Sequence, residues 1–83
     1  MNRIKGKVLW FNPKLGYGFI NNKNIKDDIY VHYSDIKCDG YKELYEDDIV
    51  CFIYDEDYNK ALNVEVIKMS KKRNQIVRTI IDN

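Results

Sequence analysis

Short stretches in which apolar and polar residues alternate run through the first 68 positions of this chain. Alternate side chains of a β-strand point to opposite faces, so this period of two predicts strands. Leu62, Val64 and Val66 follow the period closely. Turn-forming residues separate such stretches, and the pattern predicts five strands, at residues 3–11, 15–22, 29–33, 49–54 and 60–68.

The segments between these strands are rich in turn-forming residues. Asn12–Pro13 predicts the first turn, and residues 21–24 lead into a loop that ends at Asp27–Asp28. Ser34 is placed to cap a short helical turn over residues 34–36. Five short antiparallel strands in so short a chain predict an all-β fold, a small closed or nearly closed barrel that leaves little edge exposed.

Flat rings occupy alternate positions in the second and third predicted strands. Tyr17 and Phe19 share one face of their strand, and Tyr30 and His32 share one face of the next. Aliphatic residues on the opposite faces would form the core: Ile20, Ile29 and Val31. Because every base has a π-face, rings displayed on a sheet are suited to stacking unpaired bases.

The alternative interpretation is that these rings fill the core, as aromatic residues in strands more often do. Two details favour a surface. His32 would need a buried polar partner in a core. Gly16 and Gly18 weaken a strand and leave nothing to pack, but they allow close backbone approach by a ligand. We therefore expect a binding platform.

Composition excludes several classes. The 83 residues fit one domain with a small core. Cys38 and Cys51 form no CxxC pair and no secretory segment precedes them, so free thiols in a reducing cytoplasm are expected. No stretch approaches the ~20 apolar residues of a membrane span. One histidine and two cysteines at these spacings match no zinc site. We expect a cytoplasmic protein with no cofactor.

The net charge of +1 conceals an uneven distribution. Residues 1–66 carry nine Lys or Arg against twelve Asp or Glu, whereas residues 67–83 carry five against one. Phosphate attraction must therefore come from local patches, such as Lys5, Lys7 and Lys14 near the rings, or from the C-terminal segment. Stacking remains the main expected contribution to binding.

Two acidic runs, Glu46–Asp48 and Asp55–Asp57, fall in predicted loops and turns. We expect solvated loop charge there rather than a metal site. Carboxylates repel phosphate, so a bound nucleic-acid strand should avoid both runs.

Residues 69–83 form a basic extension beyond a domain at residues 1–68. Ser70 could cap a helix, although Lys71–Arg73 in the first turn would oppose the helix dipole. Four aliphatic residues lie at helical spacing: Ile76, Val77, Ile80 and Ile81. Three possibilities remain open: a short helix docked on the barrel, which these four residues favour, a self-association segment, or a disordered basic arm.

Four segments of the chain resemble the bacterial cold-shock proteins: Gly6–Asn12, Gly16–Ile20, Asp28–Ser34 and Ala61–Val64. The similarity spans about residues 3–68, with a one-residue insertion in the loop before Asp27. Both RNP-type motifs occur in order at the family's spacing, which makes the match specific. The resemblance implies a five-stranded antiparallel oligonucleotide/oligosaccharide-binding (OB-fold) barrel that binds single-stranded DNA or RNA.

The resemblance also implies roles for single residues. It implies base stacking by Trp10, Tyr17, Phe19, Tyr30, His32, Tyr33 and Tyr41. Asp28 matches a position that hydrogen-bonds bases, and Lys42 follows Tyr41 as in the family. With the neighbouring residues Lys7, Phe11 and Lys14, these form the candidate nucleic-acid-binding set. No catalytic or metal-binding residue is predicted.

Trp10 is the point at which alternation and resemblance disagree. Strict alternation from an outward Lys7 places Trp10 inward with Val8, whereas the resemblance implies that it points outward. We therefore expect a bulge or strong bend near Leu9.

Several positions depart from the family pattern. Leu9 and Leu15 replace lysines that flank the rings, and Asp57 lies where a basic residue is frequent. We expect stacking to be kept and phosphate attraction from the barrel to be reduced, with the basic extension partly restoring it.

The predicted function is single-stranded nucleic-acid binding without chemistry, as in an RNA chaperone or a cold-shock-type regulator of transcription and translation. The alternative is a protein-interaction module that uses the aromatic face and the extension. An enzyme is disfavoured because no serine or cysteine lies at a recognisable spacing from the lone His32. We expect no small-molecule substrate, and a monomer, with dimerisation through the extension as the alternative.

Overall fold

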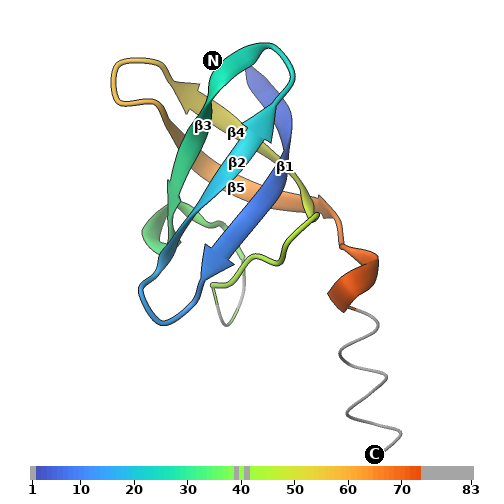
Figure 1. Cartoon of the computed structure of the whole chain (residues 1–83). Helices are drawn as coiled ribbons and strands as arrows, with labels where there is room; N and C mark the ends of the chain where they lie inside the picture. The colour runs from blue at the N-terminus through green and yellow to red at the C-terminus, as the bar shows by residue number, and fades with distance from the viewer. Residues whose placement is uncertain (1, 39, 41, 74–83) are drawn as a thin grey trace, which may run out of the picture.

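The computed structural model describes residues 2–38, 40 and 42–73, which form the barrel and the turn that follows it (Figure 1). The elements of this described part are β1 (Arg3–Asn12), β2 (Tyr17–Asn22), β3 (Ile25–His32), the 3-10 turn η1 (Tyr33–Asp35), β4 (Ile49–Asp55) and β5 (Lys60–Lys68). The strands close in the order β1-β2-β3-β5-β4. The predicted all-β, five-stranded closed barrel is confirmed. Its pairings are antiparallel except that of β3 with β5, which meet in parallel at Tyr30 and Lys60.

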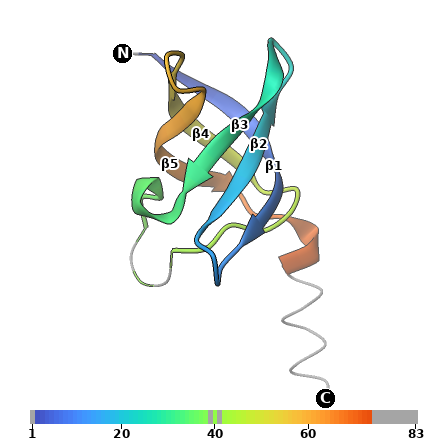
Figure 2. The same ribbon diagram turned by 60° about the vertical axis from the view of Figure 1, so that its left-hand side comes forward.

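Apolar side chains from all five strands fill the inside of the barrel. Figure 2 shows the layer of β1, β2 and β3 lying across β4 and β5. Residues from both layers are fully buried between them, among them Val8, Ile20, Phe52 and Val64. Burying one such side chain contributes roughly 1.5–3 kcal/mol. The core residues predicted on the faces opposite the rings, Ile20, Ile29 and Val31, are all fully buried.

The β2–β3 hairpin differs from the prediction. β3 begins at Ile25 rather than at residue 29, and the loop predicted from residue 21 to Asp28 is a tight turn. The side chain of Asn22 makes this turn, because its Oδ1 accepts the Asn24 N–H at 2.8 Å while its Nδ2 donates to the Lys5 carbonyl at 2.6 Å. Such local bonds favour turns.

Gly16 and Gly18 have a different role from the one predicted. A Cβ at Gly18 would collide with the Trp10 carbonyl oxygen and lie 2.7 Å from the Phe11 Cα. Gly16 has a φ of +78°, and a Cβ added to it would lie 2.6 Å from Cδ1 of the Tyr33 ring. The close approach is therefore made by the chain itself, and both glycines are buried rather than facing a ligand. β2 accordingly begins at Tyr17, not at residue 15.

The turn after β3 is capped by His32 and not, as predicted, by Ser34. The His32 Nδ1 accepts the Ser34 N–H at 3.2 Å, and the turn occupies Tyr33–Asp35. A ring nitrogen of the last strand residue thus satisfies the first free amide of the turn.

A single helical turn over Lys71–Arg73 follows β5. Ser70 caps it as predicted, since the Ser70 hydroxyl accepts the Lys72 N–H at 3.0 Å. The aliphatic residues of the predicted extension helix, Ile76, Val77, Ile80 and Ile81, lie outside the described residues. Among the residues described, no helix is long and apolar enough to cross a membrane.

Candidate nucleic-acid interface

Six rings form a continuous surface over β1, β2, β3 and η1. We call it the six-ring surface; its members are Trp10, Tyr17, Phe19, Tyr30, His32 and Tyr33. The Trp10 ring centroid lies 5.5 Å from that of Tyr17 and 5.4 Å from that of Phe19. Tyr30 continues the surface at 5.9 Å from Tyr17, with the two planes 28° apart.

The strand register explains why these rings meet. Tyr17 lies directly opposite His32 and Phe19 directly opposite Tyr30, so the alternate positions of β2 and β3 share one face. Tyr33 adds the last ring, 4.5 Å from that of His32. The predicted sharing of one face by the rings is confirmed.

Trp10 joins this surface through a bulge in β1. Val8 pairs with Ile20 and Trp10 with Phe19, so Leu9 is an extra residue without an opposite partner on β2. The bulge reverses the alternation, and Trp10 is 43% exposed. The bend expected near Leu9 is confirmed, and strict alternation alone was wrong at this position.

His32 is held in one orientation by its own turn. Its Nδ1 accepts the Ser34 N–H and lies 2.8 Å from the Ser34 hydroxyl. Because Nδ1 accepts a backbone donor, the neutral ring carries its proton on Nε2. The half-buried ring therefore offers a flat face and one N–H donor at the surface.

One predicted ring residue, Phe11, is not part of this surface, and another, Tyr41, cannot be placed relative to it. Phe11 packs against the hydrophobic core, on the side of β1 opposite Trp10. Tyr41 lies outside the described residues. The role implied for Tyr41 therefore stays a prediction.

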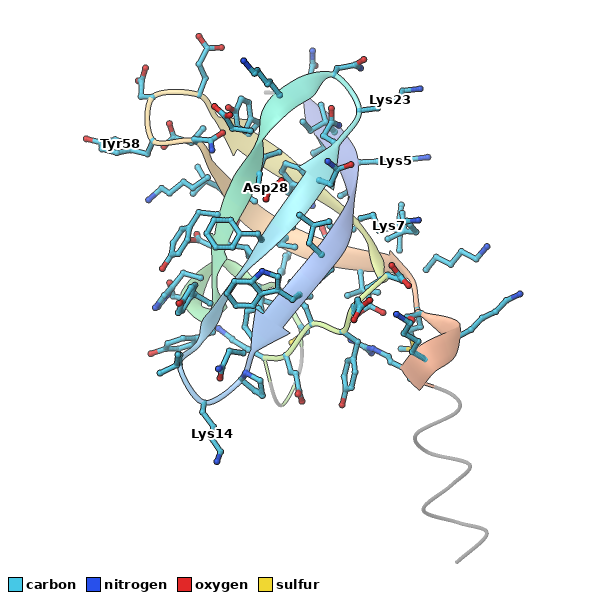
Figure 3. The ribbon with its side chains drawn as sticks, viewed as in Figure 1. Lys5, Lys7, Lys14, Lys23, Asp28 and Tyr58 are labelled. Carbon is cyan, nitrogen blue, oxygen red and sulfur yellow. The ribbon has the colours of Figure 1, made fainter. Side chains whose placement is uncertain are left out.

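The charged candidates are spread around the rings rather than gathered on one side. Lys14 and Lys42 line a pocket of about 390 Å³ together with Tyr33, at the β1–β2 turn where Figure 3 shows Lys14. Lys7 lies farther along β1 and lines a separate pocket with Asp47 and residues that follow β5.

Asp28 lies on β3 two residues before Tyr30, on the same face of the strand (Figure 3). Its carboxylate makes no hydrogen bond or ion pair with the described residues, while its carbonyl accepts the Asn59 side-chain N–H at 2.8 Å. An exposed carboxylate with free acceptors at the end of a row of rings is suited to accepting hydrogen bonds from base amino groups.

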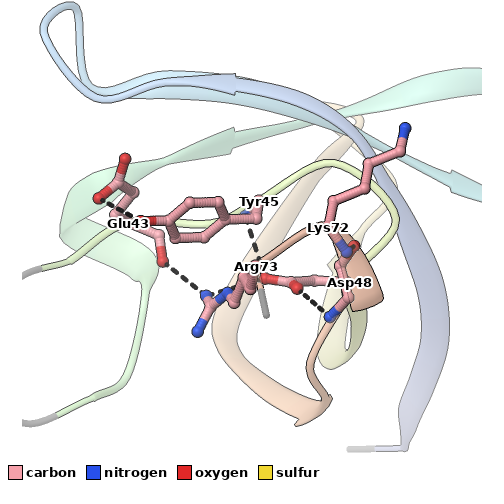
Figure 4. A network of polar contacts seen from close by, with 6 residues as sticks. Glu43, Tyr45, Asp48, Lys72 and Arg73 are labelled. Carbon is pink, nitrogen blue, oxygen red and sulfur yellow. Dashed lines mark hydrogen bonds and ion pairs between the residues drawn. The ribbon is translucent and has the colours of Figure 1, made fainter. Parts of the chain in front are cut away.

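The acidic run Glu46–Asp48 is not simply solvated loop charge, as was predicted. Asp48 is fully buried, and Arg73 pairs with its Oδ2 at 2.9 Å (Figure 4). Lys72 pairs with Glu46 at 2.5 Å and with Asp47 at 3.2 Å. Hydrogen bonds to Glu46 and Asp47 raise the pKa of Lys72 above its ordinary value.

These contacts also limit the role predicted for the basic extension. Lys72 and Arg73 are paired within the protein, so phosphate would have to compete with carboxylates for them. Lys71 is exposed and makes no ion pair with the described residues. The rest of the extension lies outside the described part.

The fold, the ring face and the bulge can now be compared with known proteins. The 'Cold-shock' DNA-binding domain family matches residues 4–69. The chain belongs to this family. It is 46% identical over 46 residues to the cold shock-like protein CspE of Escherichia coli strain K12, covering 55% of this chain and 67% of that protein. It is 38% identical over 66 residues to a cold shock-like protein of Aquifex aeolicus, covering 77% of this chain and 94% of that protein.

One pair of residues beside the interface was missed by the sequence analysis of this cold-shock domain. Lys60 begins β5 opposite Tyr30, and its Nζ lies 5.6 Å from the centre of the Tyr58 ring. Tyr58 is largely exposed at the β4–β5 turn, where Figure 3 shows it pointing away from the barrel. A lone tyrosine in an otherwise acidic turn was the available signal. The parallel contact between β3 and β5, which brings Lys60 opposite Tyr30, leaves no signal in the sequence.

Proposed function

We propose that this cold-shock domain binds single-stranded RNA or DNA by stacking bases on the six-ring surface. The observation that carries the proposal is the unbroken row of ring contacts from Trp10 to Tyr33 on one face of the barrel. The rings are partly exposed although an aliphatic core is available on the other side of the same strands. Membership of a DNA-binding domain family supports the same ligand class.

Stacking supplies enough free energy for useful affinity. One base on one aromatic ring contributes roughly 1–3 kcal/mol by alanine substitution. Several such contacts give micromolar or tighter binding after the cost of association. Lys14 and Lys42 lie at one end of the row of rings, where they can bind phosphates. Asp28 lies near the other end, where its carboxylate can accept hydrogen bonds from base amino groups.

This mode of binding leads to an RNA chaperone activity. Base-paired RNA hides its base faces, so a protein that binds the faces stabilises the open form and shifts hairpins toward melting by mass action. A cold-shock-type role in transcription and translation follows from the same equilibrium, because RNA hairpins affect both processes. The reaction needs no cofactor and no bond is made or broken.

The deciding experiment is a fluorescence titration of Trp10, the only tryptophan of the chain. Oligo-dT and a duplex of equal length are titrated at low and moderate salt. Saturable quenching by the single strand alone is expected, with a shallow dependence of log K on log salt of roughly −0.7 per phosphate engaged. A Trp10→Ala variant followed by anisotropy of a labelled oligonucleotide should bind more weakly. Absence of quenching by both ligands would contradict the proposal and favour a protein partner for the rings.

A further inference from the structure

The C-terminal turn is joined to the barrel through one buried carboxylate. Asp48 accepts the Ser70 N–H at 2.7 Å with Oδ1 and the Tyr45 N–H at 3.0 Å with Oδ2. It is fully buried in the described structure, so it depends on these partners for its charge. The turn after β5 and the loop before β4 are thereby held at one point.

Arg73 supplies the positive charge at that point. Its Nη2 lies 2.9 Å from the Asp48 Oδ2 and donates to the Glu43 carbonyl at 3.3 Å. Its guanidinium also lies over the Tyr45 ring, 4.4 Å from the centroid. Figure 4 shows the side chain lying between the loop and the turn, and it is only 18% exposed. Arg73 is thus a half-buried arginine with several contacts through Nη2 and its guanidinium face, although its buried Nε has no hydrogen-bond partner among the described residues.

The same loop residues are bonded to β1 beside the bulge. The Val8 N–H donates to the Asp48 carbonyl at 2.9 Å, and the Asp47 N–H donates to the Val8 carbonyl at 2.8 Å. Val8 is the last β1 residue before the extra residue, Leu9. Asp47 and Asp48 therefore hold the edge of β1 that faces away from β2. Arg73 and Ser70 in turn bind the Asp48 carboxylate.

The bulge decides which side of β1 carries Trp10. Without the extra residue the alternation of β1 would turn Trp10 to the side of Val8, away from the other rings. The hydrogen bonds from Asp47 and Asp48 fix Val8 and so favour the bulged register, in which Trp10 lies 5.4 Å from Phe19. Contacts that hold Val8 can therefore affect where the Trp10 ring lies.

From these contacts we infer that residues 70–73 clamp the bulge of β1 and thereby hold Trp10 in its binding position, with Arg73 as the positioning residue. The inference rests on the proposed function of the six-ring surface. It gives the C-terminal turn a role in binding without any contact to nucleic acid. It also explains why Arg73 is half-buried against Asp48 although phosphate binding would favour an exposed arginine.

The test compares Arg73→Met with Lys71→Met in the full chain. Both remove one positive charge from the same turn, but Lys71 is exposed and has no ion pair among the described residues. Arg73→Met is expected to weaken oligo-dT binding by roughly 3- to 30-fold, the usual range for coupling through an intermediate element. In the free protein it should also make Trp10 more accessible to acrylamide. Lys71→Met should leave the acrylamide accessibility of Trp10 unchanged and should weaken oligo-dT binding by less than Arg73→Met does.

A double-mutant cycle separates positioning from general destabilisation. If Arg73 acts through Trp10, then Arg73→Met should have little effect on affinity in a Trp10→Ala background. Ile25→Val, at the far end of β3, lowers stability without touching the clamp and should leave affinity unchanged. Should Arg73→Met fail to fold, the double variant Asp48→Asn, Arg73→Met removes both charges and takes its place.

The outcomes distinguish this inference from the proposed function. Unchanged acrylamide quenching in Arg73→Met, or equal losses of affinity with and without Trp10, would overturn the clamp. Unchanged affinity in Trp10→Ala alone would overturn the stacking proposal, and the acrylamide comparison would still decide the clamp because it needs no nucleic acid. Linkage gives a further check, since oligonucleotide binding should slow hydrogen exchange of the Tyr45 and Ser70 amides in the wild type.

Discussion

His32 has two roles that different parts of one side chain carry. Its ring face continues the six-ring surface, 6.5 Å from Tyr30 and 4.5 Å from Tyr33. Its Nδ1 accepts the Ser34 N–H and so caps η1. Stacking needs a flat ring, whereas capping needs an acceptor, and substitutions can therefore separate the two.

We predict opposite effects for two substitutions of His32. His32→Asn keeps a side-chain acceptor and loses the ring, so oligo-dT affinity should fall by roughly 1–3 kcal/mol with stability near that of the wild type. His32→Phe keeps the ring and loses the cap, so affinity should be kept while the free energy of unfolding falls by about 1 kcal/mol. Urea unfolding and anisotropy titrations measure both quantities. Parallel losses of affinity and stability in the two variants would contradict the separation.

The stacking residues could be predicted because rings at alternate positions leave a visible period of two. Asp48 could not, because three consecutive acidic residues give no sign that the third is buried. Its burial depends on Ser70 and Arg73, which only the folded chain brings beside it. Phe11 shows the converse limit, since it adjoins Trp10 in sequence but packs against the core.

At the scale of elements, the interface depends on the contact between β1 and β2 at the bulge. Gly18 lies opposite Phe11, and the β1 backbone occupies the space that any side chain would need. The β1–β2 and β4–β5 hairpins could be predicted from their turn residues, but the tight β2–β3 turn and the start of β3 could not. Residues 26–28 are all exposed polar positions, so no alternation marks them as a strand.

We predict that Gly18→Ala lowers both stability and affinity. The added methyl group would meet backbone atoms of Trp10 and Phe11, which cannot move aside as a flexible side chain can. Overpacking of this kind costs roughly 1–3 kcal/mol, and the displaced strand carries Trp10 with it. Gly40→Ala is the control, since a Cβ there has nothing within 4 Å and only its φ of +90° resists the change. A Gly18→Ala variant as stable as Gly40→Ala would refute the close approach.

At the scale of the whole molecule, the interface has six aromatic rings but little positive charge beside them. Lys72 is paired with Glu46 and Asp47 and so is less available to phosphate. The lysines near the rings are few and dispersed. Net charge could be read from the sequence, but its placement on the barrel required the closed sheet. Binding should therefore depend mainly on stacking, which salt screens weakly.

A single added lysine tests this view of the whole surface. Leu15 is 64% exposed and lines the pocket that holds Lys14, Tyr33 and Lys42. Leu15→Lys should raise oligo-dT affinity at low salt and steepen the slope of log K against log salt by roughly 0.7, the value for one more phosphate neutralised. Met69→Lys adds the same charge at a 61% exposed position after β5, away from the rings, and should change the slope little. Equal steepening in both variants would mean that net charge, rather than its position beside the rings, governs phosphate attraction.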